Sequence, residues 1–205
     1  MRAAMHAIRR VLAISALLAV PAHSAVCSVN SERHEFRLLA GYSPNSPTLI
    51  GTATNRHFTM VELGYSYRCR SSREVSLSYT AAIIPAGILR QPAETTRNIP
   101  RHSVYGFGVM PVGFLVTFLR PRKVQLVAEA NGGIIASTEP IPIRAPDATG
   151  LNFLFDFGAG VRIRVRDRSA LTFGYRFLHI SNAYTTDFNP GVDNNVLYIS
   201  YSLFK

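Results

Sequence analysis

The sequence predicts an all-β protein, an eight-stranded antiparallel outer-membrane β-barrel, and three observations carry this prediction. The 205 residues are 47% hydrophobic and only 17% charged, yet the chain after its amino-terminal segment lacks the roughly 20 uninterrupted apolar residues of a spanning helix. Apolar and polar residues alternate in eight runs, which is the period of strands with two unlike faces. Short turns and long loops follow these runs in alternation, as is typical of outer-membrane barrels.

The beginning of the chain predicts export. Three arginines precede an apolar core at residues 11–20, and small residues follow it. This core is too short to span a membrane, and the whole pattern is that of a secretory signal peptide. We therefore expect a signal peptide at residues 1–25 and a single barrel domain at residues 26–205.

The chain is basic, and its charge limits the partners to be expected. Removal of the signal peptide takes away three arginines and lowers the formal charge from +10 to +7. An exported protein is not expected to bind nucleic acid. Anionic lipid headgroups or phosphates fit this charge, although a generally basic proteome explains it equally well.

Cys27 and Cys69 are the two cysteines. In an oxidising compartment they are expected to form one disulfide, because the predicted topology places both at the same rim of the barrel. Two unpaired thiols are the alternative.

The eight runs differ in clarity along the chain. The sixth is the cleanest, since every second residue from Leu151 to Val165 is apolar. Glycines and prolines interrupt the fourth, which we expect to be a bent strand. Long loops are expected at 44–56, 85–102 and 138–149. The strands are predicted at residues 34–43, 58–69, 74–81, 103–119, 124–131, 151–165, 170–182 and 193–204.

Charged side chains alternate with the apolar ones and are expected to fill the barrel interior. A barrel of eight strands is too narrow for a channel, so these charges should pair with one another as a structural core. The set is Glu35, Arg37, Glu62, Arg68, Glu74, Glu129, Asp156, Arg162 and Arg176.

Candidate catalytic residues lie in the last two runs. His179 and Ser181 continue the apolar, lipid-facing side of the seventh run, and Asp193 lies on the same side of the eighth run. Alternate residues of a strand lie about 7 Å apart on one face, close enough for an imidazole to activate a hydroxyl. An acid on the neighbouring strand can orient the imidazole. Asp187, within the intervening loop, is a weaker alternative, and the other histidines form no metal-ligand cluster.

The terminal segment resembles a known enzyme family. The stretch from Phe173 to Asn182, with its His-x-Ser-Asn sequence, and the Asn-Pro-Gly at residues 189–191 resemble the PagL-type lipid A 3-O-deacylases. The Gly-rich part of the fourth run and residues 152–160 are also similar to that family. The resemblance is therefore expected to span the whole mature chain.

This resemblance implies an outer-membrane serine esterase that needs no metal or cofactor and removes an ester-linked acyl chain from lipid A in lipopolysaccharide. It implies Ser181 as nucleophile, His179 as base and Asp193 as the acid, where the family usually has a glutamate. Aspartate is one methylene shorter, so the strands must sit closer or the acid contributes less. Oxyanion or substrate contacts are implied for Asn182, Asn189 and Gly191, and a homodimer is left open.

A second hypothesis comes from another class of function. Small outer-membrane barrels also serve structural or adhesive roles without catalysis, and a fold does not fix a function. Only the set of His179, Ser181 and Asp193 distinguishes the esterase from such a barrel.

Overall fold

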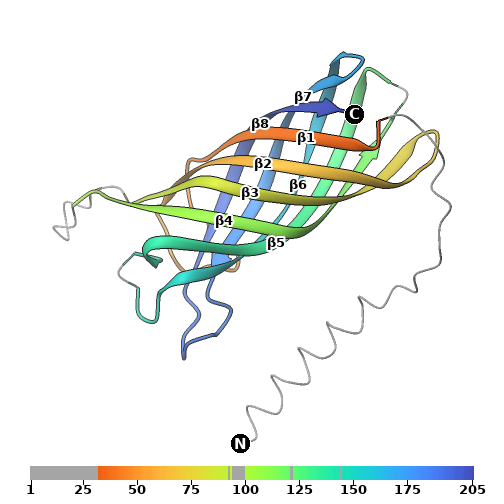
Figure 1. Ribbon diagram of the computed structural model, residues 1–205. Coiled ribbons are helices and arrows are strands. Elements are labelled where there is room, and N and C mark those ends of the chain that lie inside the picture. The colour runs from red at the N-terminus through yellow and green to blue at the C-terminus, as the bar shows by residue number, and fades with distance from the viewer. Residues whose placement is uncertain (1–31, 92, 94–99, 121, 144) are drawn as a thin grey trace, which may run out of the picture.

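The computed structural model describes residues 32–91, 93, 100–120, 122–143 and 145–205. They form eight antiparallel strands in chain order, closed into a barrel because β1 pairs with both β2 and β8 (Figure 1). The strands are β1 (His34–Ser43), β2 (His57–Ser71), β3 (Val75–Gln91), β4 (His102–Phe118), β5 (Val124–Ile141), β6 (Thr149–Arg166), β7 (Ser169–Ser181) and β8 (Gly191–Phe204). In this part of the chain no helix is long and apolar enough to cross a membrane.

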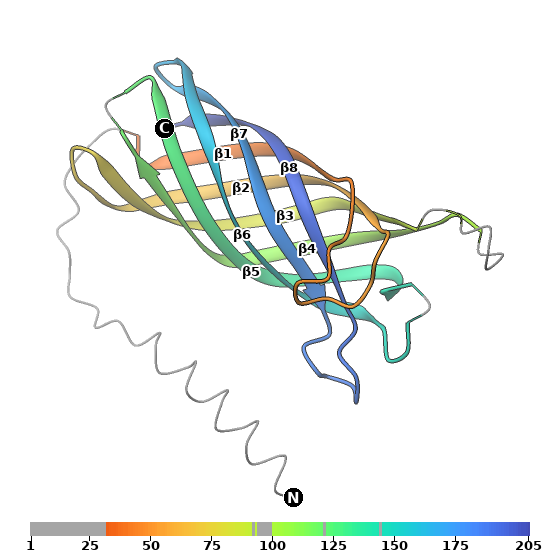
Figure 2. The same ribbon diagram turned by 180° about the vertical axis from the view of Figure 1, so that it is seen from behind.

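The predicted fold class is confirmed, and the two ends of the barrel differ as expected. Short turns join β2 to β3, β4 to β5 and β6 to β7, and the carboxyl terminus lies at the same end. The long connections after β1, β3, β5 and β7 lie at the opposite end (Figures 1 and 2). We call these the short-turn end and the long-loop end.

Two strands run further than the sequence predicts. Residues 82–91 extend β3 and residues 132–141 extend β5, although both stretches contain proline. Proline cannot donate to a strand ladder, so it is confined to edges and irregularities. The pairing shifts register between Ile84 and Gly87 and between Ala136 and Ile141, and these shifts accommodate the prolines. The bent fourth strand is confirmed, with a register shift between Val109 and Val112.

The outer wall is an apolar belt. Large apolar side chains that alternate along the strands are about half exposed, which is the expected surface of a barrel that faces lipid. They include Phe36, Leu38, Phe107, Phe114, Leu126, Phe153, Phe155, Phe157, Phe173, Leu197, Ile199 and Leu203.

The interior is filled by ion pairs in its middle layer. Arg176 contacts Glu129 at 2.8 Å and Glu62 at 2.6 Å, and Arg37 contacts the same two carboxylates at 2.8 and 2.9 Å. All four side chains are buried. Towards the long loops, apolar side chains close the interior, among them Leu39, Phe58, Met60, Ile135, Leu178 and Ile180.

Most of the predicted interior charges are confirmed, and one is wrong. Glu35, Asp156 and Arg162 are buried with the four residues above, and Arg162 contacts Glu35 at 2.6 Å. Glu74 is instead exposed, because the turn after β2 extends through residue 74 and β3 begins only at Val75. Arg68 is half-buried and lines the mouth of the barrel at the short-turn end.

The signal peptide and Cys27 lie outside the described residues. Cys69 lies near the end of β2 and is exposed. The disulfide and the processing site therefore stay predictions.

Candidate active site

A histidine and an aspartate contact each other on the outer wall near the long-loop end. His179 of β7 and Asp193 of β8 are direct cross-strand partners, and His179 Nδ1 lies 2.6 Å from Asp193 Oδ1. The Asp193 side chain is buried, whereas 12% of the His179 side chain is exposed. A carboxylate at Nδ1 fixes the imidazole tautomer and leaves Nε2 as the acceptor of a proton.

The second oxygen of Asp193 is held by the loop between β1 and β2. The backbone amides of Ile50 and Gly51 donate hydrogen bonds of 2.7 and 2.9 Å to Asp193 Oδ2. The same loop, residues 44–56, crosses the outside of β8, and Figure 2 shows it in orange beside the end of that strand. We call it the β1–β2 loop.

Two glycines let the β1–β2 loop approach β8. The Gly191 carbonyl accepts hydrogen bonds from the amides of Thr52 and Ala53 at 2.9 and 3.0 Å. A Cβ placed on Gly51 would lie 2.7 Å from Gly191 O and 3.0 Å from Asp193 N. A larger residue would fit only if the backbone of the loop or of β8 shifted, so this close packing requires glycine.

Ser181 ends β7 two residues after His179, on the same outward face. It is 5% exposed and pairs across the sheet with Gly191. A Cβ on Gly191 would lie 2.7 Å from His179 Cε1 and 3.4 Å from its Nε2, so the free edge of the imidazole lies towards the Ser181–Gly191 pair. No hydrogen bond joins Ser181 to His179 among the described residues; such contacts commonly tighten only when substrate binds.

The two asparagines predicted to contact substrate differ in their surroundings. The Asn182 side-chain amide donates to Asp147 O at 3.0 Å, Thr186 Oγ1 at 2.7 Å and Phe188 O at 3.0 Å, and this shapes the loop after β7. Asn189 Oδ1 is buried without a hydrogen-bond partner in the described part of the chain. A flip of that amide presents either a donor or an acceptor at the same place.

The remaining titratable candidates do not join this site. Asp187 is exposed in the loop after β7. His34, His57 and His102 contact Tyr65, Tyr42 and Glu139, respectively. Across the described residues no group of His, Cys, Asp and Glu has the arrangement of a metal site.

An aromatic stripe runs down the outer wall from the site. Phe153 and Phe155 of β6 are the cross-strand partners of Ser181 and His179, and each is 48% exposed. The stripe continues through Phe157, whose ring centroid lies 5.8 Å from that of Phe155 and 5.4 Å from that of Phe177. A linear alkyl chain could pack against this surface.

Sequence reasoning missed the β1–β2 loop as a part of the site. The loop contributes the backbone amides of Ile50 and Gly51. Because almost every residue has a backbone amide, such donors cannot be recognised from the sequence. Only the glycine at position 51 hints at a close approach.

The closed barrel and its apolar belt define a small outer-membrane barrel, and the His–Asp pair lies on its outer wall. The family model for lipid A 3-O-deacylase (PagL) matches residues 59–202, which is more than half of the chain. The chain therefore belongs to the PagL lipid A 3-O-deacylase family and lies in the outer membrane. The matched range includes Ser181, His179 and Asp193. β1 and the β1–β2 loop precede the matched range.

Solved structures share the fold at low sequence identity. The crystal structure of the outer membrane enzyme PagL matches with a TM-score of 0.54 and 17% identity, over 81% of this chain and 97% of that one. Neisserial surface protein A matches with a TM-score of 0.51 and 11% identity, over 85% and 99% of the two chains. No curated protein matches this chain.

Proposed function

We propose that the chain removes the ester-linked 3-O-acyl chain of lipid A in the outer leaflet, with Ser181 as nucleophile, His179 as base and Asp193 as the orienting acid. The observation that carries the proposal is the 2.6 Å contact between His179 and Asp193. This contact lies on the outer wall of the barrel, and His179 is two residues from Ser181. An ester of a membrane lipid can reach this wall from within the leaflet.

In the first half of the reaction Ser181 Oγ attacks the ester carbonyl carbon. His179 Nε2 takes the hydroxyl proton, and the buried Asp193 carboxylate stabilises the imidazolium. The tetrahedral intermediate collapses, the bond to the sugar oxygen breaks, and His179 returns the proton to that leaving oxygen. In the second half, water activated by His179 hydrolyses the acyl-serine and releases a fatty acid.

The oxyanion of each intermediate needs positioned hydrogen-bond donors. Asn189 and the backbone beside Gly191 are the candidates, because Gly191 pairs with Ser181 across the sheet and Asn189 precedes Gly191 by two residues. The amide of Asn182 is already engaged in three contacts, so we assign it to holding the loop after β7. The acyl chain that is transferred to Ser181 is expected to pack along the aromatic stripe below it.

The test is a mass measurement on lipid A. Purified protein incubated with lipopolysaccharide in detergent is expected to lower the mass of lipid A by one hydroxyacyl chain. An unchanged mass would favour the alternative of a structural or adhesive barrel.

Asp193→Ala is expected to reduce turnover by roughly 10² to 10⁴ while leaving residual activity, because an orienting acid is less critical than the nucleophile. Turnover can be followed by the release of fatty acid. Asp187→Ala is the matched control, since that side chain is exposed in the adjacent loop, and it should retain full activity. The opposite ranking of the two variants would assign the role to Asp187.

Gly51→Ala is expected to lift the β1–β2 loop from β8, because the added Cβ would lie 2.7 Å from Gly191 O. Asp193 then loses two donors, and misplacement of a catalytic group by about 1 Å costs on the order of 100-fold in rate. Hydrogen exchange at residues 50–53 should accelerate in parallel. Gly132→Ala is the control, since a Cβ there meets nothing within 4 Å; equal behaviour of the two variants would argue against a role for the loop.

A further inference from the structure

The two ends of the barrel differ sharply in charge. The three short turns, with four residues of each flanking strand, carry nine Arg and Lys residues against Glu74 and Asp167, a net formal charge of +7. The four long loops counted in the same way carry no net charge. The proposed active site lies at the long-loop end, so catalysis does not account for this asymmetry.

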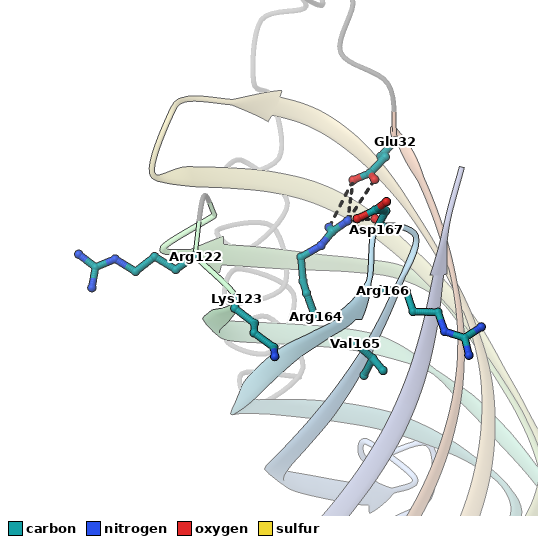
Figure 3. Close-up of a pocket in the computed structure, with 7 residues that line it drawn as sticks. All are labelled: Glu32, Arg122, Lys123, Arg164, Val165, Arg166 and Asp167. Carbon is teal, nitrogen blue, oxygen red and sulfur yellow. Dashed lines mark hydrogen bonds and ion pairs between the residues drawn. The ribbon is translucent and has the colours of Figure 1, made fainter.

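Part of this charge surrounds a pocket at the rim between β5 and β6, with a volume of about 420 Å³. Its basic lining residues are Arg122, Lys123, Arg164 and Arg166. Arg164 lies 3.1 Å from Glu32 and also donates to the Asp167 carbonyl. Figure 3 shows Arg122 and Arg166 directed away from that cluster, on opposite sides of it.

Several cations of this rim have no internal counter-charge. No ion pair joins Arg122, Lys123 or Arg166 to any residue that the structure describes, and all three are exposed. Cations held close together repel one another unless anions are nearby. The rim therefore favours an external anion.

The position of these cations relative to the apolar belt selects the kind of anion. Val165, which also lines the pocket, is 51% exposed. Val124, the first residue of β5 and the cross-strand partner of Ile163, is 48% exposed. Both are at the last level of the lipid-facing wall before the turns. A lipid whose acyl chains pack on these valines brings its phosphate to the level of Arg122 and Arg166, whereas a soluble anion gains nothing from the apolar wall.

We propose that the short-turn rim at Arg122, Lys123 and Arg166 binds the headgroup phosphates of anionic glycerophospholipids, with Arg122 and Arg166 contacting different lipid molecules because they point to opposite sides. These lipids occupy the leaflet opposite to that of the substrate, and they anchor the barrel at a fixed depth. Each cation near a lipid surface contributes about fivefold in affinity. The site is independent of the proposed deacylase activity.

The experiment measures which lipids stay bound to the full chain in mixed nanodiscs of phosphatidylcholine and phosphatidylglycerol. After transfer to detergent, retained lipids are counted by native mass spectrometry. Wild type is expected to retain phosphatidylglycerol selectively, and Arg122→Ser/Arg166→Ser is expected to lose this selectivity by roughly 25-fold. The variant should fold, because both side chains are exposed and make no ion pair in the described structure.

The matched control removes two exposed cations from the other end, Arg90→Ser/Arg101→Ser, and it should retain phosphatidylglycerol like wild type. If this control lost as much phosphatidylglycerol as Arg122→Ser/Arg166→Ser, retention would depend on net charge alone, and the proposed site would be wrong. Unchanged retention in Arg122→Ser/Arg166→Ser would overturn it as well, as would full displacement of the lipid by soluble glycerophosphoglycerol. Deacylase activity measured on the same samples is expected to be unchanged, so the two proposals fail separately.

Discussion

Ser181→Ala is expected to lower the deacylation of lipopolysaccharide by about 10⁴-fold or more, because loss of a nucleophile leaves only binding and oxyanion stabilisation. His179→Ala should be affected to a similar degree, since the two groups act as a unit. The double variant should then be little worse than either single one. The measurement is the initial rate of fatty-acid release at saturating lipopolysaccharide.

The control for this loss is Ser103→Ala. Ser103 lies in β4 near the same end of the barrel and makes no side-chain hydrogen bond to a described residue, so full activity is expected. Folding of every variant can be followed by the slower migration of the heat-denatured barrel on gels. A folded Ser181→Ala protein with wild-type rates would exclude Ser181 as the nucleophile.

Arg176→Met is expected to destabilise the barrel by about 3–5 kcal/mol, which is the cost of breaking a buried ion pair by removing one partner. Arg176 is 1% exposed, contacts Glu62 and Glu129, and lies with its guanidinium carbon 5.0 Å from the centre of the Tyr198 ring. Its loss leaves the two glutamates to share Arg37. The free energy of unfolding can be measured with urea in lipid vesicles by circular dichroism, because the chain contains no tryptophan.

A second variant separates charge from packing in this network. Glu129→Gln/Arg176→Met removes one charge of each sign and should recover part of the lost stability, since fewer buried carboxylates are left without a counter-charge. Arg122→Met, at an exposed position, should change the free energy of unfolding by less than about 0.5 kcal/mol. If Arg176→Met were as stable as Arg122→Met, the interior network would not be a structural core.

The strands were predictable because lipid outside and a filled interior impose opposite polarity on alternate residues. In β6 only Leu154 interrupts this alternation, and the predicted bounds of 151–165 lie within the observed Thr149–Arg166. The extensions of β3 and β5 were missed because their prolines suggest loops. Register shifts beside these prolines depend on the neighbouring strand and cannot be read from one run alone.

The sequence also predicted that His179 and Asp193 lie on the same side of the sheet. It did not predict that they are direct cross-strand partners, because the register depends on how β7 and β8 are joined. The pairing explains how Asp193, one methylene shorter than the glutamate usual in the family, can still contact His179. Since Asp193 is the cross-strand partner of His179, its carboxylate reaches Nδ1 at 2.6 Å. Asp193→Glu is accordingly expected to lower activity, because one more methylene must disturb either the imidazole or the amides of Ile50 and Gly51.

Activation of Ser181 by His179 is tested most directly by finding which residue reacts with an alkyl fluorophosphonate. This reagent forms a covalent bond to an activated serine oxygen with loss of fluoride. Peptide mapping by mass spectrometry should find the adduct on Ser181 in wild type, and the adduct should be absent from His179→Ala. An adduct on another serine, or equal labelling of Ser181 in His179→Ala, would contradict activation of Ser181 by His179.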